Sequence, residues 1–175
     1  ILLVLLLSIA GVYAGGSSES ADSDVYKIGF IGPLTGDNAN YGIRCSNAAR
    51  LAIDKINAAG GVGGKTLELI AEDSEGTVDK AIAGYEKLVY SDNVVAIIGP
   101  VFTSPALAVA QRAMEDEIVM ISPSATHKDV TAQARNNADG KNYVFRTVPS
   151  DALQAEVASY YFYQVLGYRK LATLY

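Results

Sequence analysis

The chain has 175 residues, 50% of them hydrophobic, which is enough for one domain with a core of its own. Its formal net charge of -5 argues against nucleic acid and anionic membrane surfaces as partners. The single cysteine, Cys45, excludes an internal disulfide and a cysteine-based zinc cluster, and the single histidine, His127, argues against a histidine-rich metal site. We therefore expect neither a bound metal nor a cofactor.

The first residues are typical of an export signal. Residues 1–7 are all Ile, Leu or Val, but the apolar run is shorter than the roughly 20 residues that a membrane-spanning helix needs. Small residues and then a polar stretch follow it, as at a signal-peptidase site. We interpret residues 1–14 as a signal peptide that lacks its basic start, and residues 15–25 as a flexible linker. A core helix is the weaker alternative because the run has no polar face. The protein is expected to be periplasmic or otherwise extracytoplasmic.

From residue 26 onward, strand and helix patterns alternate. The predicted strands are 26–31, 67–71, 94–98, 118–121, 143–146 and 171–175. The predicted helices are 41–59, 78–89, 105–115 and 151–166. This alternation predicts an α/β fold: a Rossmann-like parallel sheet with helices on both faces.

Residue spacing also predicts two details of the helices. The inward stripe of the first helix is expected to comprise Cys45, Ala48, Ala49, Ala52 and Ile56. The last helix is expected to begin with a capping pair formed by Asp151 and Gln154.

Small and hydroxyl-bearing residues follow three of the predicted strands. They include Gly32, Thr35, Gly36, Gly99, Thr103, Ser104, Ser122, Ser124 and Thr126. Ligands of such sheets bind beyond the carboxyl ends of the strands. Small residues let a ligand approach the backbone, and free N–H and hydroxyl groups form a neutral rim that can receive an anion. The alternative is that these residues only form turns and helix caps, and Thr103 or Ser104 does occupy a position that suits an N-cap.

Several segments, in order, resemble the periplasmic binding proteins of the leucine/isoleucine/valine type, which are soluble receptors of ABC transporters. They are "KIGFIGPLTG…NYG", "AAGGVGGKTLELIAEDSEG", "VVAIIGPVFTSPALA", "IVMISPSAT" and "YVFRTVPSDALQ". The resemblance runs from residue 26 to the last residue. It implies a type I fold of two Rossmann-like lobes that trap the ligand between them. Residues 26–146 would form the first lobe, and residues 147–175 a hinge crossing and the beginning of the second, whose remainder is absent. We therefore interpret the sequence as an N-terminal fragment.

The same resemblance implies a set of ligand-binding residues. The hydroxyl of Thr103, or of Ser104 beside it, would receive the α-carboxylate of an amino acid. The backbone of Ser124 and Ala125 and the hydroxyl of Thr126 would hold the amino-acid head. An aromatic side chain, Tyr41, would line the first-lobe side of the pocket. The partner of the ligand's ammonium group would lie in the second lobe. Ser122 is nearer the strand, and we do not expect it to contact the ligand.

Other motifs favour structural interpretations. Residues 59–66 match a relaxed phosphate-loop pattern, but a predicted helix enters this loop and a predicted strand leaves it, which reverses the geometry that aims N–H groups at phosphate. Asp73 and Glu75 could suggest a catalytic or metal-binding pair, yet a solvated loop capped by Asp73 is favoured. His127 has no recognisable catalytic partner and is expected at the surface, and Cys45 is expected to be a small core residue.

The function expected from these observations is that of a non-enzymatic extracytoplasmic receptor. It would bind an amino acid, a branched-chain one by preference, or a related small polar solute, and deliver it to the membrane permease of an ABC transporter as a monomer. One alternative is the amino-acid-sensing ectodomain of a signalling receptor. The less favoured alternative is an α/β enzyme, because the chain lacks a nucleophile elbow and a dinucleotide-binding glycine pattern.

Overall fold

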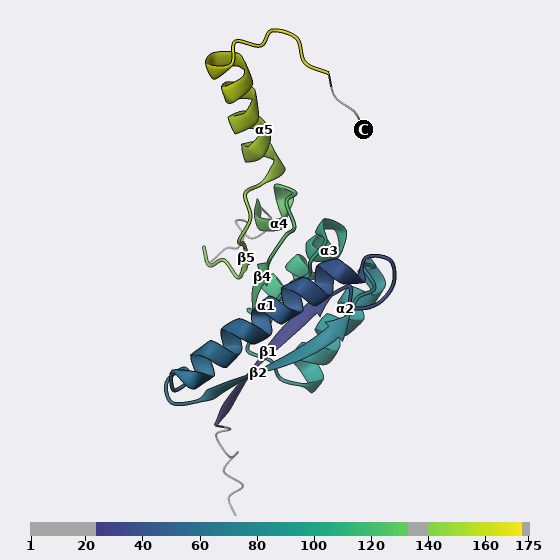
Figure 1. Cartoon of the computed structure of the whole chain (residues 1–175). Helices are drawn as coiled ribbons and strands as arrows, with labels where there is room; N and C mark the ends of the chain where they lie inside the picture. The colour runs from purple at the N-terminus through teal and green to yellow at the C-terminus, as the bar shows by residue number, and fades with distance from the viewer. Residues whose placement is uncertain (1–23, 133–139, 173–175) are drawn as a thin grey trace, which may run out of the picture.

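Five parallel strands form one sheet in the order β2-β1-β3-β4-β5 (Figure 1). This computed structural model describes residues 24–132 and 140–172. The strands are β1 (Val25–Gly32), β2 (Thr66–Asp73), β3 (Ala96–Ile98), β4 (Val119–Ser122) and β5 (Val144–Arg146). The α/β class predicted from the sequence is confirmed. The predicted signal peptide, residues 1–14, lies outside the described residues.

The helices connect the strands in the predicted alternation. They are α1 (Ala39–Ala58), α2 (Val78–Glu86) with its π-helical continuation η1 (Lys87–Ser91), α3 (Thr103–Glu115), the short α4 (Asp129–Ala132), and α5 (Asp151–Tyr160) with its π-helical continuation η3 (Tyr161–Val165). In Figure 1, α1 crosses one face of the sheet, while α2 and α3 lie behind it. No helix in the described ranges is long and apolar enough to cross a membrane.

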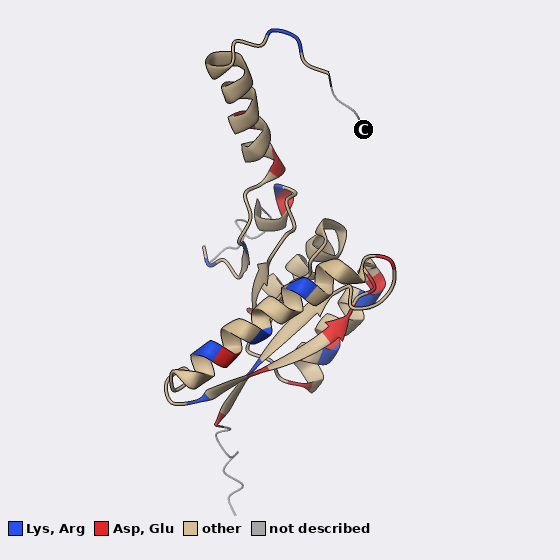
Figure 2. Cartoon of the chain, viewed as in Figure 1, with Lys and Arg blue, Asp and Glu red and all other residues tan. Residues whose placement is uncertain are grey.

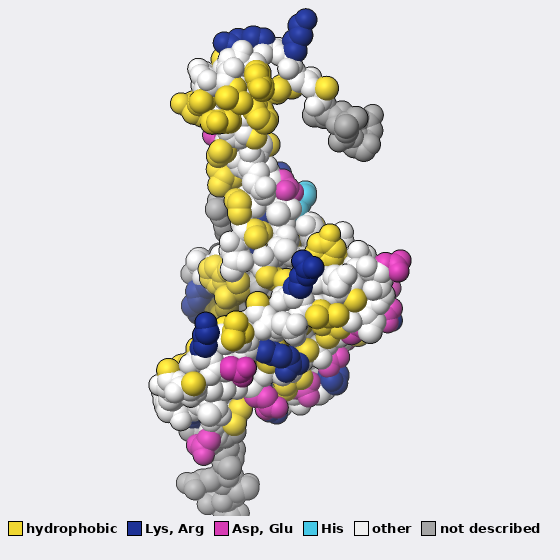
Figure 3. All heavy atoms as spheres, viewed as in Figure 1, with side chains coloured by type: hydrophobic (Ala, Val, Ile, Leu, Met, Phe, Trp, Pro, Cys, Tyr) yellow, Lys and Arg dark blue, Asp and Glu magenta, His cyan; other side chains and the backbone are white. Residues whose placement is uncertain are grey.

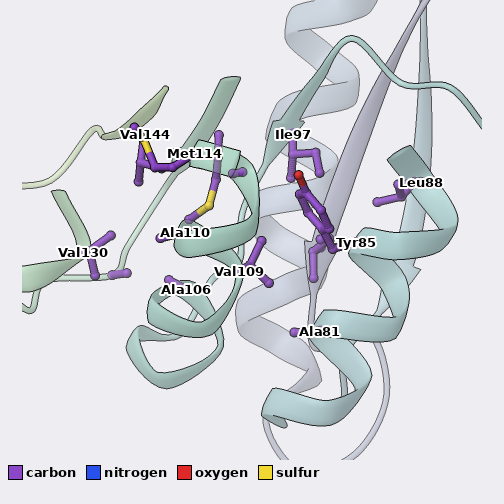
Figure 4. Close-up of a cluster of buried hydrophobic side chains, with 14 of the residues drawn as sticks. Ala81, Tyr85, Leu88, Ile97, Ala106, Val109, Ala110, Met114, Val130 and Val144 are labelled. Carbon is purple, nitrogen blue, oxygen red and sulfur yellow. The ribbon is translucent and has the colours of Figure 1, made fainter. Parts of the chain in front are cut away.

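The main core lies between the sheet and the helices α2 and α3 (Figure 4). Tyr85 of α2 and Met120 of β4 are fully buried there, together with the small inward residues of α3. The Tyr85 hydroxyl donates to the Asp116 carboxylate at 2.8 Å, so its polar end is paired. Burial raises the pKa of the Tyr85 phenol, and the neighbouring Asp116 raises it further. Tyr85 therefore stays neutral and serves as a core side chain.

The other face of the sheet is covered only in part. A cross-strand row there runs from Phe30 through Ile98 and Ile121 to Phe145, as the strand register shows. Phe30 is fully buried on β1, whereas Ile121 and Phe145 are 37% and 42% exposed. Helix α1 contacts β1 and β2, which explains why the far end of the row is bare.

The inward face of α1 differs from the predicted stripe. Its buried residues are Gly42, Ser46, Ala49 and Ile53, while Ala48 and Ala52 are exposed, Ile56 is 38% exposed, and Cys45 is only half-buried. The prediction chose the stripe richest in apolar side chains, but the helix turns Gly42 toward the loop that follows β1. A Cβ atom at Gly42 would lie 1.9 Å from the Pro33 carbonyl oxygen, so this close approach requires glycine.

Helix α5 projects away from the sheet and buries none of its residues (Figure 1). Its side chains are largely apolar and exposed, as Figure 3 shows, and it carries few charges (Figure 2). Its N-cap is Ser150, whose hydroxyl accepts from the Leu153 N–H, so the predicted capping pair was wrong: Asp151 is already helical, and Gln154 donates to the Pro149 carbonyl.

The last predicted strand, 171–175, does not form at Leu171 or Ala172, and residues 173–175 lie outside the described residues. A strand requires a neighbour with which to pair. The one sheet of the described chain ends at β5, and no strand adjoins residues 171–172.

Candidate functional site

The loops that follow the strands meet at the carboxyl edge of the sheet. The chain passes from β1 to β2 on one side and then returns to β3 on the other side of β1, so the strand order reverses between β1 and β3. A crevice at such a reversal is where ligands bind in open α/β sheets. The loop after β1 and the loop after β3, which leads into α3, flank this position.

Asp73, the last residue of β2, holds the loop after β1 in place. Its carboxylate accepts from the Leu34 N–H at 2.7 Å, the Thr35 hydroxyl at 2.5 Å and the Glu75 N–H at 2.8 Å. Burial tends to raise the pKa of Asp73, but these hydrogen bonds outweigh it and hold the pKa below its usual value. Asp73 therefore joins the loop after β1 to the loop after β2, and its described hydrogen bonds serve to hold these loops in place.

Ser122, the last residue of β4, joins the loop after β3 to the loop after β4. The side chain is fully buried. Its hydroxyl donates to the Pro100 carbonyl at 2.7 Å and accepts from the Ala125 N–H at 3.1 Å. The Ser124 hydroxyl adds a second bond between the loops by donating to the Val101 carbonyl at 2.5 Å. These bonds fix the position of residues 122–125 against the loop that leads into α3.

Thr126, Thr103 and Ser104 leave polar groups available. In the described part of the chain, the N–H and the hydroxyl of each of these residues have no hydrogen-bond partner. Thr103 and Ser104 begin α3, whose first N–H groups carry the positive end of the helix dipole. The Ala125 N–H, in contrast, is already paired with Ser122. The rim therefore offers N–H and hydroxyl donors on two loops that Ser122 holds together.

An aromatic pair stands beside these donors. The ring of Tyr41 on α1 packs edge to face against the ring of Phe102, with the ring centroids 5.7 Å apart. Phe102 occupies the N-cap position of α3. Tyr41 is 61% exposed and lines a hollow of about 270 Å³ with Asn40 and Arg44. The Phe102 ring also lies against Gly76, where a Cβ atom would approach it to 3.1 Å. This pair offers an apolar wall to a ligand side chain.

The structure brings the predicted site residues to one edge of the sheet. Ser124 and Ala125 form hydrogen bonds that hold the loops, whereas Thr103, Ser104 and Thr126 keep donors that are unpaired within the described chain. Three parts of this arrangement were missed: Asp73 and Ser122 as the bonds between loops, and Phe102 as the partner of Tyr41. A sequence signal existed only for Phe102, which directly precedes the predicted donor Thr103.

The glycine-rich loop and His127 lie as the sequence predicted, the loop with reversed geometry and the histidine at the surface. Helix α1 enters the glycine-rich loop at residues 59–65 and β2 leaves it, so its geometry is the reverse of a phosphate loop. Lys65 lies over the Tyr26 ring, 5.2 Å from its centroid. His127 is exposed, and its Nδ1 atom accepts from the Asp129 N–H at 3.3 Å. No group of acidic, histidine or cysteine side chains within the described ranges could hold a metal ion.

Known proteins are similar to this chain in sequence and in fold. The profile of the family described as periplasmic binding protein matches residues 25–175. The "Leu/Ile/Val-binding protein homolog 3" of Brucella melitensis biotype 1 is 32% identical over 173 residues, which are 99% of this chain and 45% of that protein. The chain thus spans about half the length of the curated relatives that it matches.

Solved structures agree with the sequence comparison. The branched-chain amino acid transporter substrate-binding protein LivJ of Streptococcus pneumoniae, in complex with isoleucine, matches 82% of this chain and 39% of its own chain with a TM-score of 0.71 and 31% identity. A solute-binding protein of an ABC transporter from Rhodopseudomonas palustris, in complex with 3,4-dihydroxybenzoic acid, matches 73% of this chain and 33% of its own with a TM-score of 0.64 and 30% identity. The family match over residues 25–175 and the 32% identity over 99% of the chain show that this chain belongs to the periplasmic binding protein family.

Proposed function

We propose that this chain supplies the first lobe of an extracytoplasmic receptor that binds a small carboxylate-bearing solute for delivery to an ABC transporter permease. The observation that carries the proposal is the set of unpartnered donors at Thr103, Ser104 and Thr126. Thr103 and Ser104 follow β3 at the strand-order reversal, where open α/β sheets bind ligands, and Ser122 bonds their loop to the loop that carries Thr126. Membership of a family of binding proteins supports a non-enzymatic, extracytoplasmic role.

The ligand's carboxylate would be received at the start of α3. The N–H groups and hydroxyls of Thr103 and Ser104 are donors, and the helix dipole adds a favourable field for negative charge. Thr126 would donate to the same head group from the loop after β4, while Ser124 and Ala125 give that loop its shape and bring its backbone close to the ligand. Tyr41 and Phe102 would contact the ligand side chain.

Branched-chain amino acids are the ligands that fit best. The name of the Brucella melitensis relative includes leucine, isoleucine and valine, and the Streptococcus pneumoniae protein holds isoleucine. An apolar wall beside a row of carboxylate donors suits such a molecule. The aromatic acid bound by the Rhodopseudomonas palustris protein presents the same carboxylate with an aromatic side group, which the Tyr41–Phe102 pair could also contact. It is the second ligand class that we would test.

We further propose that residues 26–146 form this lobe and that residues 147–175 begin the hinge and a second lobe. Two lobes would supply contacts from both sides and exclude water, and the second would provide the partner of the ligand's ammonium group. We use the term two-lobed protein for this chain continued through a complete second lobe. It is expected to act as a monomer.

Calorimetry on the two-lobed protein tests the proposal. We expect isoleucine or leucine to bind and isoleucine amide, which keeps the side chain but lacks the carboxylate, to bind far more weakly. Equal affinity for isoleucine and its amide would contradict a carboxylate seat at Thr103 and Ser104. Binding of 3,4-dihydroxybenzoate in preference to both amino acids would show that the ligand is an aromatic acid, while the carboxylate would still bind at Thr103 and Ser104.

A further inference from the structure

Arg146 ends β5 and reaches back over the loop that carries Thr126. Its Nη1 atom donates to the Thr126 carbonyl at 3.1 Å and to the His127 carbonyl at 2.8 Å. Its Nη2 atom donates to the Thr131 hydroxyl at 3.1 Å. One guanidinium therefore holds two carbonyls of the loop between β4 and α4 and one hydroxyl within α4. Without it, the only described hydrogen bond to Thr126 would come from the first residue of α5.

The Thr126 carbonyl has a second donor, on the far side of the connection between β5 and α5. The Asp151 N–H, at the first residue of α5, donates to it at 3.0 Å. A carbonyl oxygen has two lone pairs, so both bonds can form together. Thr126 thus lies between two sets of contacts. Its carbonyl is held by the last residue of the sheet and the first residue of α5, while its N–H and hydroxyl are left for a ligand.

The bonds from residue 147 strengthen the same connection. The Thr147 N–H donates to the Ser122 carbonyl at 3.2 Å, and its hydroxyl donates to the Pro123 carbonyl at 3.3 Å. The start of the connection is therefore bonded to the end of β4 and to the first residue of the following loop, and its end is bonded to Thr126. Any rotation of α5 about residues 148–150 must carry the Thr126 peptide with it or break the bond from Asp151.

We infer that Arg146 is a positioning residue and that the Thr126 carbonyl couples the ligand seat to α5. Arg146 fixes the Thr126 peptide so that its donors face the crevice, and the Asp151 N–H transmits the position of that peptide to the first helix beyond the sheet. This inference rests on the proposed function, because it takes Thr126 as a ligand contact. It goes further in naming the residue that orders the seat and the bond through which ligand occupancy and α5 orientation influence each other.

Two pairs of variants of the two-lobed protein separate these roles. Arg146→Lys keeps the charge but cannot span the three acceptors, and Arg112→Lys changes an arginine of α3 that pairs with Glu86 of α2. Asp151→Pro removes the N–H that reaches Thr126 and also the side-chain carboxylate, but it should leave the helix intact, because proline is tolerated at the first helical position and Ser150 is already extended. Asp151→Asn keeps that N–H and controls for the lost carboxylate.

The measurements are isoleucine affinity by calorimetry and, without ligand, hydrogen exchange of the 122–131 segment and the melting temperature. We expect Arg146→Lys to weaken isoleucine binding by about tenfold or more, since two carbonyls lose a charged donor. Exchange at 126–131 should accelerate, with a melting-temperature change no larger than that of Arg112→Lys. Arg112→Lys should bind isoleucine as the parent does. Asp151→Pro should weaken binding relative to Asp151→Asn and abolish the isoleucine-induced NMR shift of the Leu153 amide that we expect in the parent.

The inference has clear contrary outcomes. Parent-like affinity and exchange in Arg146→Lys would remove the positioning role. An identical Leu153 response in Asp151→Pro and Asp151→Asn would remove the coupling through Thr126. Either result, together with weakened binding by Thr126→Val, would leave the proposed function intact and refute only this inference. If the parent binds none of the ligand classes named above, the proposed function is refuted and this inference is refuted with it.

Discussion

Replacing Ser122 by alanine tests the bond that joins the two loops of the site. The hydroxyl is fully buried, donates to the Pro100 carbonyl and accepts from the Ala125 N–H. Alanine removes both bonds and adds no new partner. Pro100 and Ala125 are themselves buried, so water does not readily replace the lost hydroxyl.

The expected loss of stability follows from those two groups. A buried donor or acceptor left without its partner costs about 1–3 kcal/mol. Two such groups, with partial relaxation of the loops, should lower the free energy of unfolding by about 2–4 kcal/mol, which is a large share of the roughly 5–15 kcal/mol of a typical domain. Residue order alone offers no reason to expect this, because Ser122 resembles its exposed neighbours.

Urea unfolding of the 175-residue chain, followed by circular dichroism, measures the effect, with Ser124→Ala as the matched control. Ser124→Ala removes one bond, from an exposed hydroxyl to the Val101 carbonyl, instead of two bonds of a buried hydroxyl, so we expect a smaller loss of about 1 kcal/mol. Equal and small losses in the two variants would show that the Ser122 bonds do not hold the loops together.

Three further predictions concern Asp73, the isolated chain and Lys65. Hydrogen bonds lower the folded-state pKa of Asp73, so its contribution to stability should be present above the ordinary carboxyl pKa near 4 and be lost as the pH falls below that value. Urea unfolding at several pH values should therefore show the stability of Asp73→Asn converging on that of the parent only at acidic pH. A stability difference that does not change with pH would refute this linkage. The isolated 175-residue chain should bind amino acids with a Kd no lower than about 1 mM, and micromolar binding would be a contrary result. In sedimentation it should self-associate through α5 and the exposed apolar row near Phe145, and Phe145→Ser and Val157→Ser should reduce that association. A strictly monomeric chain would contradict this second expectation. Lys65→Ala should leave ligand affinity unchanged, and ATP with magnesium should not raise the melting temperature, since the loop at 59–65 lies between a helix and a following strand; a magnesium-dependent stabilisation would revive a nucleotide site.

The sequence predicted the elements whose patterns are local. The alternation of strands and helices and the reversed phosphate-loop geometry both come from residue order and periodicity, and the structure confirms them. The failures concern what each element packs against. On α1, the apolar spacing favoured Ala48 and Ala52, but the contact of Gly42 with the Pro33 carbonyl sets a different face. Periodicity cannot reveal such an approach between a helix and a distant loop.

In the candidate site, too, some residues could be predicted from the sequence and others could not. Thr103 and Thr126 could be proposed from sequence because small and hydroxyl residues follow three of the predicted strands, and because a family resemblance marked them. The bonds made by Ser122 and Arg146 could not be foreseen. Their partners lie 22 and 20 residues away, at Pro100 and Thr126, and only the strand register brings them into contact.

Isoleucine and leucine titrations of the two-lobed protein and of its Thr126→Val variant test the central claim most directly. Valine keeps the shape and β-branching of threonine and removes only the hydroxyl, so the melting temperature without ligand should change by no more than a few degrees. A charge-assisted hydrogen bond shielded from water contributes about 1.5–3 kcal/mol, so we predict a loss of affinity of roughly ten- to a hundredfold. Thr66→Val, at the opposite end of β2, should bind as the parent does. If Thr126→Val binds both amino acids as tightly as the parent, Thr126 is only a turn residue and the ligand site lies elsewhere.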